Sequence, residues 1–139
     1  MITPPDLELW LTTFLRAQLA ARKIAATVSN KEPAQLSAPL SKPLIVIRED
    51  GGPGKTEITY TRTCGVSILG GTRQHDQPTK DLARLAYAIL TDHEPIALAA
   101  GSPVVAVEFS GCDGPYTVPD PQDVTRAYFV VEYTVVGSW

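Results

Sequence analysis

Apolar residues recur with helical spacing in residues 78–91, the clearest amphipathic segment of the chain. They fall at positions i, i+3, i+4, i+7 and i+8 and are Leu82, Leu85, Ala86, Ile89 and Leu90. Pro78 suits a first helical turn, Asp81 lies near the positive end of the helix dipole, and Pro95 should prevent continuation. The spacing predicts a helix that packs this apolar face against the core.

A second helical stripe begins near the N-terminus. Residues 3–6 (TPPD) have the composition of a helix start, with Thr3 as a capping hydroxyl and proline at the first position. The stripe reaches about Arg22 and consists of Leu7, Leu11, Phe14, Leu15 and Leu19. Leu9 and Trp10 lie beside this stripe, so they either widen the core face or form a second contact surface.

Alternating or continuous apolar runs elsewhere predict strands at residues 24–29, 44–47, 57–69, 103–110 and 126–136. The run 44–47 is continuous, which indicates burial on both faces, and 57–69 suggests a register change near Arg62. Between these runs, proline and glycine predict a long surface loop at 30–43, a turn at 49–55 and a rigid loop at 111–121. We expect a single α+β domain, residues 1–139, in which two helices cover one face of a mixed, mostly antiparallel sheet of about four to five strands.

Composition narrows the class of protein. The hydrophobic fraction of 44% can form a core, and the net charge of −3 gives no basic footprint for tight nucleic-acid binding. No apolar run approaches the ~20 residues of a membrane span, and we expect no signal peptide. The two cysteines, Cys64 and Cys112, are expected to be unjoined thiols.

Two patterns invite an enzymatic interpretation. Residues 51–56 (GGPGKT) resemble a phosphate-binding loop, but Glu49 occupies the required first glycine position and a strand follows, which favours a hairpin turn. His75 with Asp76, and residues 92–94 (DHE), could suggest metal ligands, but no third ligand is spaced to complete a site. A protonated His93 would instead be favourable near the C-terminus of a helix. We therefore predict no catalytic, cofactor-binding or metal-binding residues.

The last third of the chain carries a family resemblance. The segments 114–116 (GPY), 119–121 (PDP) and 126–129 (RAYF), which lead into a long strand, resemble the C-terminal part of tail terminator proteins of long-tailed bacteriophages. The two predicted helices and the glycine turn at 51–52 occur in the order found in that family. The resemblance covers nearly the whole chain through the order of its elements.

The resemblance implies a structural virion protein. Such proteins assemble into a ring, typically of six copies, at the head-proximal end of the tail after synthesis in the host cytoplasm. The ring would cap the tube of tail tube protein, stop its polymerisation and offer a surface to the head–tail connector protein, while DNA passes through its centre. Two alternatives are a head–tail connector or neck protein of similar fold, and a small nucleotide- or metal-dependent enzyme.

A ring subunit needs two different, complementary contact surfaces. One candidate is the face of the 78–91 helix opposite its apolar stripe, which carries Lys80, Arg84 and Tyr87. Another is the 49–55 turn, predicted to project as a hairpin tip with Glu49, Asp50 and Lys55. The last strand, 126–136, is a third candidate if it forms an edge of the sheet.

Overall fold

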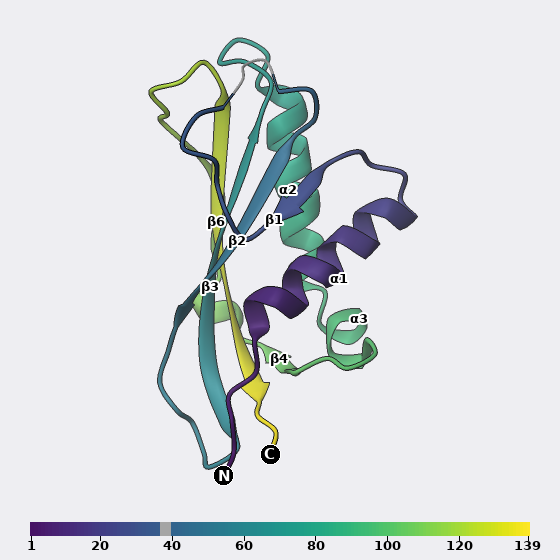
Figure 1. Cartoon of the computed structure of the whole chain (residues 1–139), viewed down its shortest axis with the longest axis vertical. Coiled ribbons are helices and arrows are strands. Elements are labelled where there is room, and N and C mark those ends of the chain that lie inside the picture. The colour runs from purple at the N-terminus through teal and green to yellow at the C-terminus, as the bar shows by residue number, and fades with distance from the viewer. Residues whose placement is uncertain (37–39) are drawn as a thin grey trace.

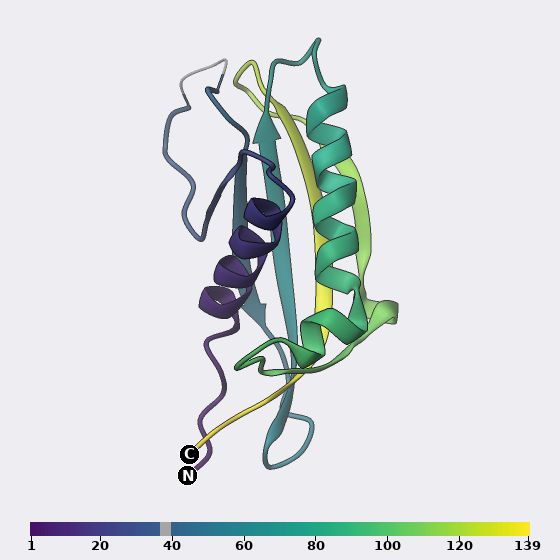
Figure 2. The same ribbon diagram turned by 90° about the vertical axis from the view of Figure 1, so that its right-hand side faces the viewer.

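The computed structural model describes residues 1–36 and 40–139, so part of the predicted 30–43 loop lies outside the described residues. Helices and strands are arranged as one mixed sheet with helices on one face, which confirms the predicted α+β class (Figures 1 and 2). In chain order the elements are α1 (Leu7–Ala21), β1 (Thr27–Ser29), β2 (Leu44–Gly51), β3 (Thr59–Gly70), α2 (Gln77–Thr91), α3 (His93–Leu98), β4 (Val104–Val107), the 3₁₀ turn η1 (Phe109–Gly111), β5 (Asp113–Val118) and β6 (Thr125–Val136).

The sheet has the order β1-β2-β3-β6-β4, and β5 also pairs with β6. Among the strands that the structure describes, β1 and β2 pair in parallel, and the other pairings are antiparallel. The last strand is therefore central, with β3 on one side and β4 and β5 on the other, and its prediction as an edge is wrong. The apolar pattern of β6 does not indicate its central position, because that position depends on strands elsewhere in the chain. These strands, β4 and β5, are short and pair with opposite halves of the long β6.

The two long helices lie side by side on one face of the sheet (Figure 2). The apolar stripe of α1 is buried as predicted, but its cap is Asp6, whose Oδ1 accepts the Leu9 N–H at 3.1 Å. Thr3 instead pairs with Ser138 through backbone hydrogen bonds of 2.7 and 3.0 Å, which holds the two ends of the chain together (Figure 1).

Most of the predicted α2 face is buried. Leu82, Ala86, Ile89 and Leu90 are buried, whereas Leu85 is half-buried and Ala83 replaces it in the core. Tyr87 is not fully on the opposite face, because it is half-buried and meets the ring of Phe129 edge-on at 5.4 Å. The helix is thus rotated so that small alanines approach the sheet.

The alternation in β6 is confirmed. Its core-facing residues, all buried, are Ala127, Phe129, Val131, Tyr133 and Val135. β3 pairs with β6 residue for residue over its whole length, so the register change expected near Arg62 is wrong; the shift lies in β2, between Glu49 and Gly51. Cys64 is buried in this core and both cysteines are free, as expected.

Two short elements differ from the prediction. Helix α3 follows α2 directly, and Pro95 lies in its first turn, where a missing N–H costs nothing. His93 therefore begins α3 rather than ending a helix. The segment predicted as a rigid loop at 111–121 contains β5, in which the Gly114–Pro115 peptide bond is cis.

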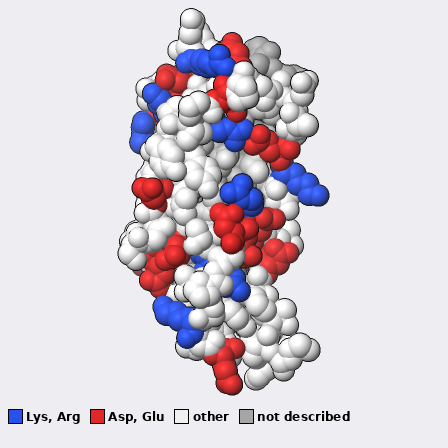
Figure 3. All heavy atoms as spheres, turned by 90° about the vertical axis from the view of Figure 1, so that its left-hand side faces the viewer, with Lys and Arg blue, Asp and Glu red and all other residues white. Residues whose placement is uncertain are grey.

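In the described part of the chain, the opposite face of the sheet carries no helix (Figure 1), and Figure 3 shows the surface on this side. Acidic and basic side chains are interspersed over it, with uncharged surface between them. At one end Leu44, Leu69 and Val124 form a small second cluster on which Leu36 and Leu40 pack. This cover explains why the continuous apolar run 44–47 has buried residues on both faces of β2.

Candidate assembly surface

A groove runs between α2 and the edge strand β5. Its volume is about 160 Å³, and it is lined by Lys80, Ala83, Arg84, Pro115, Tyr116, Thr117 and Ala127. The helix supplies the two cations, the strand supplies an exposed tyrosine, and an alanine of β6 lines the groove between them. Two of the predicted contact residues, Lys80 and Arg84, therefore lie together beside a sheet edge.

Both cations are paired within α2. Lys80 Nζ lies 2.9 Å from Asp76 Oδ2, and Arg84 pairs with Asp81 one turn away. The hydrogen bond from Lys80 lowers the pKa of Asp76. Because the side chains of both pairs are well exposed, the pairs contribute little to stability and can exchange for carboxylates of another molecule.

Tyr87, the third predicted contact residue of α2, is placed differently. It packs on Phe129 and burial raises its pKa, so part of its ring belongs to the core. The exposed aromatic residue of this region is Tyr116 on β5, which is 44% exposed and meets the ring of Tyr128 at 5.9 Å. The sequence does not indicate Tyr116 as a contact residue, because the proline and glycine of its segment predict a loop where β5 lies.

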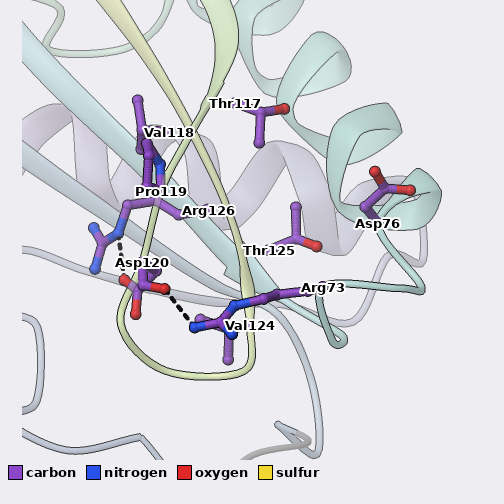
Figure 4. A pocket seen from close by; sticks show the side chains of 9 residues that line it. All are labelled: Arg73, Asp76, Thr117, Val118, Pro119, Asp120, Val124, Thr125 and Arg126. Atoms are coloured by element: carbon purple, nitrogen blue, oxygen red, sulfur yellow. Dashed lines mark hydrogen bonds and ion pairs between the residues drawn. The ribbon is translucent and has the colours of Figure 1, made fainter.

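A larger hollow of about 480 Å³ adjoins the groove and shares Thr117 with it (Figure 4). Arg126 extends beside it and binds Asp120 at 2.8 Å and both oxygens of Glu32 at 2.9 and 2.7 Å. Arg73 donates to the backbone oxygen of Asp120 at 2.7 Å. The guanidinium of Arg126 is already committed to two carboxylates, so its role here is to hold the β5–β6 loop and the 30–36 segment against the sheet.

β2 and β3 form the predicted hairpin, but only part of the predicted tip lies in its turn. Glu49 and Asp50 lie within β2, and Asp50 pairs with Arg48 of the same strand at 2.8 Å. Lys55 does lie in the β2–β3 connection, but it folds back so that its Nζ meets Thr134 Oγ1 at 3.1 Å and Glu108 at 3.4 Å. The Thr134 hydroxyl also donates to Glu108 at 2.5 Å. This bond, followed by the contact with Lys55, lowers the pKa of Glu108. The strand extends past Glu49 because the bulge before Gly51 keeps it paired with β3.

Acidic groups gather where β2 meets the start of α1. The Glu8 carboxylate accepts the Glu49 backbone N–H at 2.9 Å and the Asn30 side-chain N–H at 2.9 Å. Burial, together with Asp6 and Glu8, raises the pKa of Glu49 against the opposing effect of Arg62. Among the described residues, Glu49 Oε1 is buried without a hydrogen-bond donor.

The residues weighed for enzymatic roles are scattered. His75 and His93 are exposed, and no group of three potential metal ligands occurs in the described part of the chain. The 51–56 segment leads from one antiparallel strand to the next, as predicted for a hairpin. Burial raises the pKa of the Cys64 thiol far above its ordinary value, which makes it a poor nucleophile. No helix in residues 1–36 or 40–139 is long and apolar enough to cross a membrane.

No protein-family model matches the chain, and none of the curated proteins compared with it matches either.

Proposed function

We propose that the chain is the ring-forming subunit of a phage tail terminator, which caps the tail tube, stops its polymerisation and presents a surface to the head–tail connector. The observation that carries the proposal is the order and layering of its elements. Helix, strand, hairpin, helix and a long last strand follow one another, with both long helices on one face of the sheet. This is the order on which the sequence resemblance rests.

The surface supports a structural role in assembly. Large apolar side chains are exposed at several places on the surface, in particular Leu9, Ile58, Leu98, Val105, Phe109, Tyr116 and Trp139. The aromatic ones, Phe109, Tyr116 and Trp139, are of the kind enriched where proteins meet. The ion pairs around the α2–β5 groove are exposed and exchangeable, which suits a contact surface better than an enclosed catalytic pocket.

Native mass tests the proposal. We expect purified protein, at high concentration or with tail tubes, to form a ring near six times the 15.0 kDa monomer, measured by light scattering and seen as an annulus in electron micrographs. In a tube-polymerisation assay, added protein should shorten tubes in proportion to its concentration and mark one end. A protein that stays monomeric, alone and with tubes, would overturn the proposal.

The same assay separates the alternatives. A connector or neck protein of similar fold would form a ring without arresting tube growth. An enzyme would remain a monomer and show turnover, and micromolar ATP binding that disappears in Lys55→Ala would favour it. Since Lys55 is paired with Glu108 and Thr134, we expect calorimetry with ATP and magnesium to give no heat of binding.

A further inference from the structure

The two outer edges of the sheet have different unpaired segments. β5 pairs with β6 on one side, and the described residues place no strand on its other side, where the α2–β5 groove opens. At the opposite edge β1 pairs with Leu44, Ile45 and Val46, and residues 47–51 of β2 extend beyond it. Within this segment the Glu49 N–H donates to the Glu8 carboxylate at 2.9 Å, a bond that an added strand would replace. An edge with free backbone groups is a template for pairing with another chain.

The directions of these segments are compatible. β2 and β6 are both antiparallel to β3, and β5 is antiparallel to β6, so β5 also runs antiparallel to β2. Glu49 is level with Val131 of β6 through Cys64, whereas Tyr116 of β5 pairs with Tyr128, about three residues away. A second copy must therefore be shifted by about three residues along the strand direction to bring its residues 47–51 alongside β5 in antiparallel pairing.

The charges at the two edges become complementary when Lys80 and Arg84 exchange their exposed partners, Asp76 and Asp81, for carboxylates of another copy. Both helices cover the same face of the sheet, so α2 at the β5 edge and the start of α1 at the β2 edge lie on the same side (Figure 2). The β5 edge carries Lys80 and Arg84 beside its groove. The β2 edge carries Glu8 at the Glu49 backbone, with Asp6 close enough to act on the Glu49 charge.

We infer that a second copy of this chain is the occupant of the α2–β5 groove. Residues 47–51 of that copy add as a strand to β5, and Lys80 and Arg84 face its Asp6, Glu8 and Glu49. The contact is head-to-tail, as a closed ring requires, and uses a different surface on each copy. This inference rests on the proposed ring and specifies how neighbouring subunits join.

Cross-linking of wild-type protein tests the contact directly. A mixture of ¹⁴N- and ¹⁵N-labelled protein is treated with a carbodiimide, which joins amines to carboxylates, and linked peptides are identified by mass spectrometry. Peptides of mixed isotope should join Lys80 to Asp6, Glu8 or Glu49. The link from Lys80 to Asp76 within one copy is the internal control, because their side chains already touch.

Charge reversal gives a second measurement. Lys80→Glu combined with Arg84→Glu should raise the concentration needed for ring formation at least tenfold, while circular dichroism stays unchanged. Lys42→Glu is the control, since Lys42 is exposed in the loop before β2 and lies outside both edges of the contact; this variant should assemble normally.

The outcomes separate the two proposals. A ring that persists in the reversed variant, with Lys80 cross-links between copies absent or directed elsewhere, would overturn the strand-addition contact and leave the ring intact. A protein that is monomeric under every condition would overturn both.

Discussion

Glu49 is a carboxylate whose charge is poorly compensated. Burial and the nearby Asp6 and Glu8 raise its pKa above the ordinary value of 4.5, and Arg62 only partly opposes this. A raised folded-state pKa means that ionisation of Glu49 disfavours the folded state. The free energy of unfolding should therefore fall as pH rises from about that ordinary value through the folded pKa.

The substitution Glu49→Gln removes this effect. We expect the variant to have a higher urea midpoint than wild type at pH 7, because no buried negative charge remains, and the difference should disappear near pH ~3.5, where both proteins are uncharged at this position. Asp50→Asn on the same strand is the control, since Asp50 and its partner Arg48 are both exposed. A Glu49→Gln variant less stable than wild type at pH 7 would contradict this assignment.

Two leucines of α2 differ in how far they are buried. Leu90 is fully buried and Leu85 is half-buried beside the core. Leu90→Ala should lower the free energy of unfolding by about 2–5 kcal/mol, through lost burial and the cavity left behind. Leu85→Ala should cost about 1 kcal/mol, because solvent already reaches this side chain. Equal losses in urea denaturation would mean that α2 is rotated differently from the structure.

At the scale of elements, strong periodicity was predictable and weak periodicity was not. α2 and β6 are long enough for spacing to fix their type and their buried face. β5 has six residues, including Gly114 and Pro115, and an edge strand tolerates such residues because its outer side makes no ladder bonds within the chain itself. Pro95 predicts the end of a helix, yet the same residue is compatible with the first turn of α3.

The contact surface was predictable only in part, because only some of its residues lie on an element with strong periodicity. Lys80 and Arg84 could be assigned to the solvent side of α2 from spacing alone. Their neighbour Tyr116 could not, because its position depends on the pairing of β5 with β6, which brings distant segments together. The place of Glu49 opposite Cys64 depends on the alignment of β2 with β3, which no local pattern indicates.

The β5–β6 loop is fixed by one arginine. Arg126 binds Asp120 and Glu32, and the side chains of Arg126 and Asp120 are only 18% and 4% exposed. Arg126→Met should lower the free energy of unfolding by about 2–4 kcal/mol, because two carboxylates lose their partner and one of them is buried. Arg48→Met, which breaks an exposed pair, should cost about 0.5 kcal/mol or less.

The effect of Arg126→Met should depend on pH with a definite sign. Burial opposes ionisation of Asp120, but the Gln122 N–H and Arg126 outweigh it and lower the pKa of Asp120 below its ordinary 3.8. Its stabilising contribution is therefore present above that value and lost as pH falls through the lower folded pKa. The difference between wild type and variant in denaturant melts should shrink below pH ~3.5. A difference that stays constant as pH falls would show that Arg126 acts through packing.

At the scale of the whole molecule, charge bears on what a ring could do. The chain has a net charge of −3, and the helix-free face of the sheet mixes both signs without a continuous basic stripe (Figure 3). Binding to DNA without sequence preference depends on neutralising phosphates with lysine and arginine. Several basic residues are also paired with carboxylates of their own chain, which reduces what they can offer to phosphate.

A ring of such subunits should let DNA pass without holding it. We predict no binding of labelled duplex DNA in fluorescence anisotropy at ~150 mM salt with protein up to about 100 µM, since non-specific binders typically reach 10⁻⁴–10⁻⁶ M. The absence of binding should hold for assembled and dissociated protein alike, because assembly through Lys80 and Arg84 would bury cations rather than expose them. The same probe mixed with a basic DNA-binding protein confirms that binding would be detected. Micromolar affinity with a steep salt dependence would contradict a passive conduit and favour a subunit that grips the DNA end.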